Sequence, residues 1–176
     1  MINIQVDEMT SAHPLYTEIK EYFDTKTVFE PVLVDVWAER GACIATAQDG
    51  ETLVGFSINF CVNNHGNLTK NNEFMAFIQQ NNLDMAKMVA ACVYLDDEYL
   101  GQGLTDKMTL ARSQHSLEHG YTHQVCFGFE TPEIFAYTQS ISGNIDTGAI
   151  DDYGYPIIVR TIQDAIDCMI DKGVTY

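Results

Sequence analysis

The segment from Lys87 to Phe129 constrains the fold most. It starts with the continuous apolar run KMVAACVYL, passes through a loop with two glycines, and continues with a helical pattern from about Leu104 to His119. Gly120 then ends the helix, and a second strand-like run, THQVCFGF, follows. A continuous apolar run is typical of a strand that is covered on both faces. Strand, glycine loop, helix and strand in this order predict a right-handed β-α-β crossover with two parallel central strands.

The sequence on either side of this unit predicts more strands and helices. Asp49-Gly50 separates the β-rich runs CIATAQ and ETLVGFSINFCV, and an Asp-Gly pair between such runs is a strong hairpin signal. Apolar and polar residues alternate over Ile2–Val6, which predicts a first strand. The other predicted elements are helices after His13-Pro14, over Pro31–Glu39 and after Pro132, strands over Asn144–Ile150 and Pro156–Ile162, and a last helix over Gln163–Lys172.

The chain length predicts one domain of the α/β class. It has 176 residues, 46% of them hydrophobic and 19% charged, which is a globular composition, and it shows no internal repeat or low-complexity linker. Residues 63–84 are rich in asparagine around the short apolar stretch EFMAFIQQ. We interpret them as an inserted surface segment, and residues 163–172 as an additional C-terminal helix. In the helix after the glycine loop, Leu104, Met108, Ala111 and Leu117 are predicted to form the buried side.

The net charge restricts the partners of the protein. It is −16 at neutral pH, which repels nucleic acid phosphates and argues against nonspecific DNA or RNA binding. The same charge favours cationic partners such as polyamines, basic peptides or aminoglycoside-like molecules. Two other interpretations stay open: the acidity serves solubility alone, or the protein imitates nucleic acid and occupies a basic binding protein.

The location of the protein and the state of its cysteines follow from absent patterns. No apolar run approaches the roughly 18–20 residues that span a bilayer, and MINIQVDEMT lacks the basic and apolar regions of a signal peptide. We therefore expect a cytoplasmic protein without a membrane partner. The five cysteines stand singly without a CxxC pair, which predicts reduced, mostly buried thiols, with a catalytic cysteine as the alternative.

The glycine loop carries the chemistry that the sequence indicates most clearly. Gly101 and Gly103 have no Cβ, so backbone N–H groups there can approach an anion closely. The helix that begins near Leu104 points its unpaired N–H groups and positive dipole end at the same place. Thr105 can add a hydroxyl and Lys107 a positive charge. The pattern therefore predicts a pyrophosphate site, with a turn that serves packing alone as the alternative.

At this loop the chain resembles the GCN5-related N-acetyltransferase (GNAT) family. The coenzyme A loop of that family commonly reads like VDPEYRGQGLG, and the chain reads LDDEYLGQGLT, with a hairpin ending in LVGF before it and a helix closing in EHG after it. The resemblance covers about residues 1–162, most strongly 43–60 and 89–129. It implies a GNAT-like mixed, mostly antiparallel central sheet with helices on both faces. It also implies acetyl-CoA as co-substrate, no metal, and a homodimer as one option for assembly.

The resemblance assigns the residues that bind coenzyme A. The family signature Q/R-x-x-G-x-G/A falls on Leu100, Gly101, Gln102, Gly103, Leu104 and Thr105. Leu100 replaces the usual Arg or Gln, and Thr105 replaces the last Gly or Ala. The resemblance further implies that the central strands splay apart near Leu95 and Phe127 and that backbone groups of Val93 and Leu95 bind the pantetheine.

The implied reaction is direct transfer of an acetyl group to a primary amine of a small molecule or a protein. Tyr137 matches the family's acid for the leaving thiolate, although Ile141 stands where the pattern Y-x-x-x-G-F has glycine. Glu98 is the candidate base. The alternatives are a tyrosine that only packs on the core and a solvated turn carboxylate. The two changes in the loop motivate an alternative function, a non-catalytic acidic binding protein that has lost its coenzyme A site and binds a basic protein partner.

A metal site is the weaker interpretation of the histidines. His115 and His119 are four residues apart on one helix, and His123 follows soon after. No HExxH pattern accompanies them. We therefore expect exposed histidines, with His119 near the helix C-terminus.

Overall fold

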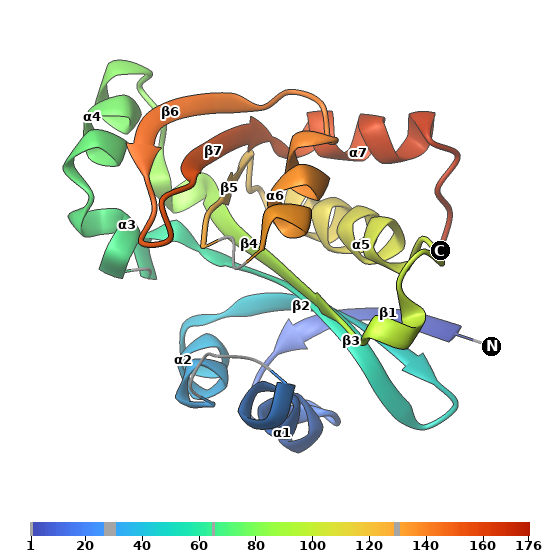
Figure 1. Cartoon of the computed structure of the whole chain (residues 1–176). Helices are drawn as coiled ribbons and strands as arrows, with labels where there is room; N and C mark the ends of the chain where they lie inside the picture. The colour runs from blue at the N-terminus through green and yellow to red at the C-terminus, as the bar shows by residue number, and fades with distance from the viewer. Residues whose placement is uncertain (1, 27–30, 65, 129–130) are drawn as a thin grey trace.

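A computed structural model describes residues 2–26, 31–64, 66–128 and 131–176. Seven strands form one sheet in the order β1-β2-β3-β4-β5-β7-β6 (Figure 1). Only β4 and β5 run parallel among the paired strands of the described residues, and the other pairs are antiparallel. The strands are β1 (Ile2–Met9), β2 (Ala42–Asp49), β3 (Thr52–Cys61), β4 (Met88–Leu95), β5 (His123–Cys126), β6 (Ile145–Ile150) and β7 (Pro156–Thr161).

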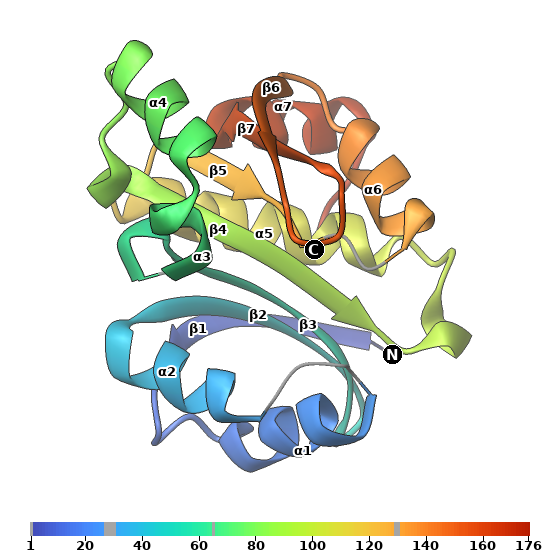
Figure 2. The same cartoon turned by 60° about the vertical axis from the view of Figure 1, so that its left-hand side comes forward.

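Helices cover both faces of this sheet, as Figure 2 shows. They are α1 (Tyr16–Lys26), α2 (Val32–Arg40), α3 (Gly66–Lys70), α4 (Asn72–Gln80), α5 (Leu104–Glu118), α6 (Pro132–Gln139) and α7 (Ile162–Asp171), with short 3-10 turns at 62–64, 85–87 and 97–99. Alternation along β2 explains the two layers: Ile44 packs in a cluster with residues of α1 and α2, whereas Ala45 packs against α5. The predicted fold class is confirmed. In the described part of the chain no helix is long and apolar enough to cross a membrane.

The predicted hairpin and crossover are present. Gly50 has φ +63 in the turn between β2 and β3, where glycine takes the left-handed conformation without strain. The central strands β4 and β5 separate after three residue pairs: only Met88–Ala90 of β4 pair with His123–Val125 of β5. The remainder of β4, Ala91–Leu95, has no pairing with β5, so the splay predicted from the sequence is present. Phe129, at the end of the predicted second strand, lies outside the described residues.

The segment 63–84 is more than the surface insertion that we predicted. Leu68 of α3 and Phe74 and Ile78 of α4 are buried in the main core. Asn71 caps α4 by accepting a hydrogen bond from the Phe74 N–H, and its Nδ2 donates to the carbonyl of Ile150 at 3.2 Å. The segment is therefore packed against β6 and forms part of the wall of a cavity.

The buried side of α5 also differs from the prediction. Leu117 is 38% exposed, whereas Met108, Arg112 and Ser116 are buried. These three are spaced four residues apart and so lie on one helix face, and Leu117 is rotated away from it. Polar residues occupy that face because the helix crosses the gap between the splayed strands, where backbone carbonyls of β3 and β4 accept hydrogen bonds from Arg112.

Candidate active site

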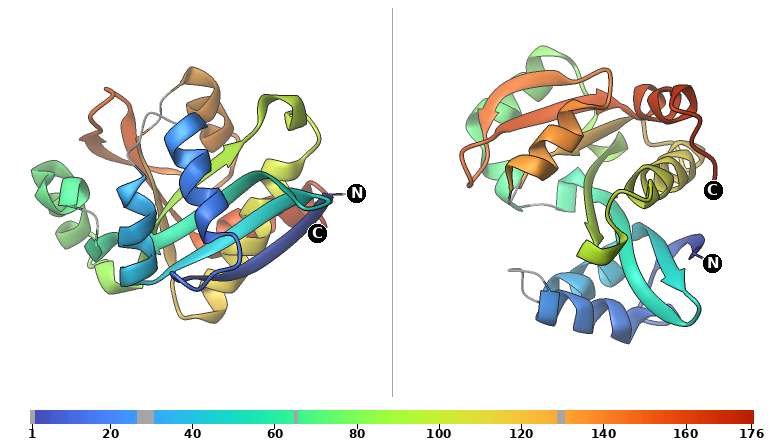
Figure 3. Two further views of the ribbon diagram at one scale, coloured as in Figure 1. Left: turned by 90° about the horizontal axis from the view of Figure 1, so that it is seen from below. Right: turned by 45° about the vertical axis from the view of Figure 1, so that its right-hand side comes forward.

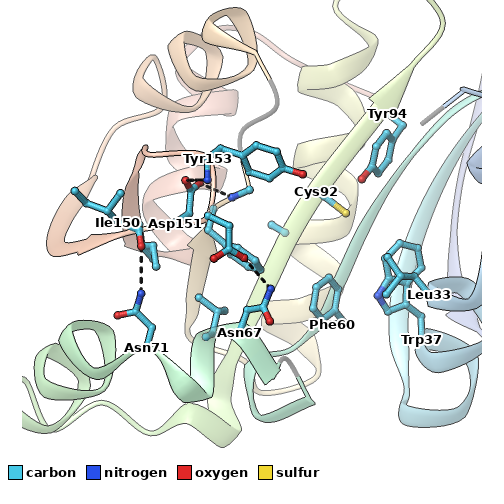
Figure 4. Close-up of a pocket in the computed structure, with 16 residues that line it drawn as sticks. Leu33, Trp37, Phe60, Asn67, Asn71, Cys92, Tyr94, Ile150, Asp151 and Tyr153 are labelled. Atoms are coloured by element: carbon cyan, nitrogen blue, oxygen red, sulfur yellow. Dashed lines mark hydrogen bonds between the residues drawn. The ribbon is translucent and has the colours of Figure 1, made fainter. Parts of the chain in front are cut away.

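Two cavities meet at the gap between β4 and β5. The aromatic cavity has a volume of about 210 Å³ and lies on the side of α2 and α3, where Trp37, Phe60, Asn67 and the loop after β6 line it (Figure 4). The arginine cavity has a volume of about 60 Å³ and lies on the side of α5 and α6. Both are lined by the same residues at the gap: Ala91, Cys92, Tyr94, Phe127 and Gly128. The two cavities therefore lie next to each other, on either side of the same gap residues.

The aromatic cavity combines ring faces with a carboxylate. Trp37 stacks on Phe60 with ring centroids 5.8 Å apart, and the two stand across β4 from Tyr153 (Figure 4). The carboxylate of Asp151 accepts hydrogen bonds from the N–H groups of Gly128, Tyr153 and Tyr155, which fixes it in its own turn. Asp152 is exposed, and its carboxylate accepts one hydrogen bond from Asn67 Nδ2 at 3.0 Å. Its other lone pairs suit it to bind a cation.

The arginine cavity contains two buried guanidinium groups. Arg112 of α5 and Arg160 of β7 are 4% and 1% exposed. Sequence reasoning missed both, although each gave a signal: Arg112 follows Met108 by one helical turn, and Arg160 ends the apolar run PIIV. Asp152 and Trp37 were missed as well, because only the fold brings their loop and helix to one cavity.

Tyr137 of α6 lies in the wall of the arginine cavity. Its hydroxyl donates to Asp106 Oδ1 at 3.0 Å and lies 3.1 Å from Thr109 Oγ1, both on α5. Burial raises the pKa of Tyr137 well above its ordinary value. The phenol is therefore protonated at neutral pH and has a proton to give.

The glycine loop leads directly into α5, which is the yellow helix in the right-hand view of Figure 3. No described side chain caps the first turn of this helix. Gly101 and Gly103 have φ +77 and +73, and Gly103 precedes α5 without a side-chain hydrogen bond that caps the helix. By contrast, side chains cap α4, α6 and α7. Leu100 is 58% exposed, Gln102 is exposed, and Thr105 and Lys107 are half-buried. Leu104, whose side chain is buried, adds only its backbone N–H to the open turn.

Val93 and Leu95 lie in the part of β4 that pairs with a described strand on one edge only. Val93 pairs with Ser57 and Leu95 with Gly55 on the β3 side, and no described strand pairs with the opposite edge beyond Ala90. Backbone groups on that edge can bind an extended ligand. Val93 also lines the arginine cavity.

The other predicted residues lie away from this site. Glu98 is exposed in the turn 97–99 and lines neither cavity.

The rings of His115 and His119 stack with centroids 4.1 Å apart, and His119 Nδ1 donates to the carbonyl of His115 at 2.8 Å. Among the described residues no group of three or more His, Cys, Asp or Glu side chains could hold a metal ion. All five cysteines are free thiols, as predicted. Cys43 and Cys126 are buried and Cys61, Cys92 and Cys168 are half-buried, so their burial is less complete than predicted.

Comparisons with known proteins bear on the fold. No protein-family model and no curated protein matches the sequence. The aminoglycoside acetyltransferase AAC(6')-Ib in complex with coenzyme A has a similar structure, with a TM-score of 0.58 at 13% identity over 92% of this chain and 96% of that one. An acetyltransferase of the GNAT family from Staphylococcus aureus Mu50 gives 0.57 at 13% identity, over 91% and 99% of the two chains.

A third similar structure is the GNAT family N-acetyltransferase YhbS from Escherichia coli in complex with CoA, with a TM-score of 0.53 at 14% identity over 94% of this chain and 84% of that one. Identities this low establish the architecture alone. The strand order, the splayed central pair and the glycine loop before α5 agree with it. The chain therefore has the fold of the GCN5-related N-acetyltransferases.

Proposed function

We propose that the protein transfers an acetyl group from acetyl-CoA to a primary amine of a small cationic molecule. The observation that carries this proposal is the meeting of two cavities, one on each face of the sheet, at the gap between β4 and β5. A donor and an acceptor need such an arrangement for direct attack, because the reacting atoms must approach to roughly 3–3.5 Å.

The residues on the donor side suit coenzyme A. The uncapped first turn of α5 and the glycines at 101 and 103 offer N–H groups to a pyrophosphate without a cluster of basic side chains. The unpaired edge of β4 at Val93 and Leu95 offers hydrogen bonds to the pantetheine. Bound acetyl-CoA would supply the thioester. Thr105 keeps its N–H in this turn, so its replacement of glycine does not remove a backbone donor.

The residues on the acceptor side suit a cation. Ring faces of Trp37, Phe60 and Tyr94 line the aromatic cavity, and aromatic faces attract ammonium groups. Asp152 adds a carboxylate at its edge. The AAC(6')-Ib structures were determined with kanamycin and ribostamycin, which supports a small-molecule amine as acceptor here.

The chemistry needs a group that takes a proton from the amine and one that gives a proton to the thiolate. Asp152 is better situated than Glu98 for the first role, because it lines the aromatic cavity and Glu98 does not. Tyr137 is suited to the second, since its hydroxyl is protonated and held by Asp106 and Thr109. The described residues offer no observation that favours a non-catalytic binding protein.

Release of free thiol from acetyl-CoA tests the proposal, with spermidine, kanamycin and a lysine peptide as acceptors. We expect release that depends on a cationic amine. In Asp152→Asn we expect the KM for the amine to rise about tenfold, since hydrogen bonds to charged groups contribute about 1.5–3 kcal/mol, and kcat to fall by about 100-fold or more, since the base is lost. Asp171→Asn, an exposed carboxylate at the end of α7, is the matched control and keeps the wild-type KM. Binding of acetyl-CoA without thiol release for any amine contradicts the proposal.

A further inference from the structure

Among the residues that the structure describes, the two guanidinium groups of the arginine cavity have only neutral partners. Arg112 Nη1 donates to the carbonyls of Ile58 and Cys92 at 3.2 and 3.0 Å. Arg160 donates to the carbonyl of Thr138 at 3.4 Å and to Cys126 Sγ at 3.0 Å. The Nε atoms of both arginines are buried without a hydrogen-bond partner. Each guanidinium thus has donor capacity left over.

Within residues 2–26, 31–64, 66–128 and 131–176, neither guanidinium has a counter-charge. In the described part of the chain no carboxylate forms an ion pair with Arg112 or Arg160. Burial lowers the pKa of Arg112, and the charge of Arg160 lowers it further, while the thiols of Cys126 and Cys92 and the Tyr137 phenol act in the opposite direction. These groups are weaker acids than carboxylates. Two unpaired cations are costly to bury, and the cost is unexpected in a chain with 25 acidic residues.

An anion in the cavity would offset this cost. Cys92 and Phe127 line the cavity at the gap, and the cavity lies on the α5 and α6 side of the sheet, which is the side of the glycine loop. Its volume of about 60 Å³ suits a short acidic group rather than a nucleotide or a peptide. The acyl end of the donor is the part of a substrate that reaches this place, whereas an acceptor approaches through the aromatic cavity on the opposite face.

We propose that Arg112 and Arg160 bind a carboxylate at the far end of the acyl group, so that the site prefers a malonyl-CoA or succinyl-CoA type of donor to acetyl-CoA. This inference rests on the proposed acyl transfer from a coenzyme A thioester to an amine, and it changes the preferred acyl group from acetyl to an acidic one. In the transfer, the acceptor nitrogen bonds to the thioester carbonyl carbon and loses one proton. The carbon–sulfur bond breaks, its electron pair leaves with sulfur, and the sulfur takes up a proton to give the free thiol. The distal carboxylate is unchanged.

Calorimetric titration of the free protein with coenzyme A, acetyl-CoA and malonyl-CoA tests the proposal without turnover. We expect the Kd of malonyl-CoA to be at least about tenfold lower than that of acetyl-CoA. This factor corresponds to the lower end of the free energy that hydrogen bonds to charged groups contribute. In Arg160→Met the Kd of acetyl-CoA divided by that of malonyl-CoA falls to about one. Arg160→Lys, which keeps the charge, retains a preference for malonyl-CoA. Lys87→Met removes an exposed charge in the turn directly before β4 and keeps the wild-type ratio.

Each outcome decides a different claim. Equal Kd values for acetyl-CoA and malonyl-CoA in the wild type overturn the inference and leave the proposed function standing. No binding of any of the three ligands overturns the proposed function. Arg112→Met provides a second test if Arg160→Met does not fold, and a ratio unchanged in the folded variant refutes the role of the arginines. A last titration compares 4-aminobutyrate with putrescine as ligands of the protein with coenzyme A bound. If 4-aminobutyrate binds more tightly and Arg160→Met abolishes the difference, the arginines bind a carboxylate of the acceptor, which overturns the assignment to the donor.

Discussion

The hydroxyl of Tyr137 lies between two polar partners on α5 and is enclosed by the wall of the arginine cavity. If it protonates the leaving thiolate, Tyr137→Phe lowers kcat by about 100-fold or more, in the range of general acid catalysis. The affinity for acetyl-CoA stays unchanged, and the free energy of unfolding falls by only about 1 kcal/mol for the lost hydrogen bond. Steady-state kinetics and calorimetry measure these effects. Tyr121→Phe, beyond the end of α5, is the control and keeps the wild-type kcat. An unchanged kcat in Tyr137→Phe would mean that the Tyr137 phenol only packs on the core.

His13 makes stability depend on pH. Burial lowers its pKa against the opposing charges of Asp7 and Glu18, and its Nδ1 accepts a hydrogen bond from the Leu15 N–H at 3.1 Å. The unfolded chain therefore takes up the proton first as the pH falls below about 6.5, and stability decreases until the folded protein is protonated as well. His13→Asn keeps an acceptor for Leu15 without the titration. We expect the wild type to lose more unfolding free energy than this variant between about pH 7.5 and 5.5 in urea denaturation. Equal losses would refute the role of His13.

Single residues differ in how well the sequence revealed them. The glycines at 101 and 103 were found because their spacing before a helix is a local pattern. Asp152 and Asn67 were not, because they are 85 positions apart and only the fold joins them in a hydrogen bond. Arg112 and Arg160 gave only weak signals, one a helical turn after Met108 and the other at the end of the apolar run PIIV, and their burial was not predicted. Residues whose role depends on contacts between distant segments leave at most a weak local pattern.

At the scale of elements, two glycines set the geometry of β4 and α5 by different means. Gly103 has φ +73 with open space where a Cβ would stand, so Gly103→Ala costs only the backbone strain, about 1 kcal/mol. A Cβ at Gly55 would lie 2.6 Å from the Tyr94 carbonyl oxygen on β4. Gly55→Ala therefore forces β3 and β4 apart and costs about 3 kcal/mol. Chemical denaturation of the two variants measures both costs, and an equal loss would contradict this distinction.

The elements themselves were largely predictable. The β-α-β unit and the hairpin follow local rules of periodicity and turn chemistry, and the helices and strands lie within a few residues of their predicted bounds. The role of the segment 63–84 was not predictable in this way. Its apolar residues Leu68, Phe74 and Ile78 fill the main core because α4 packs against β6, a contact between elements far apart in the chain.

For the whole molecule, the net charge of −16 acts on stability. Repulsion among exposed carboxylates is screened by salt, with a Debye length of about 10 Å at 0.1 M. The ion pairs Lys20–Asp35, Lys26–Asp96 and Lys172–Asp106 are partly exposed and contribute little that salt could remove. We expect Tm to rise by several degrees between about 10 mM and 300 mM sodium chloride. A Tm that falls with salt would mean that attractive pairs dominate.

The central claim for the molecule is that a coenzyme A thioester binds at the first turn of α5 with its acyl end in the gap between β4 and β5. Calorimetric titration of acetyl-CoA into the wild type, Gly103→Trp and Gly173→Trp tests it most directly. Both glycines have φ +73 and open space at the Cβ position, so the two variants share the same backbone strain, but Gly173 follows α7. We expect acetyl-CoA to bind to the wild type and to Gly173→Trp but not to Gly103→Trp. No binding to the wild type at millimolar acetyl-CoA, or equal binding to all three proteins, would contradict it.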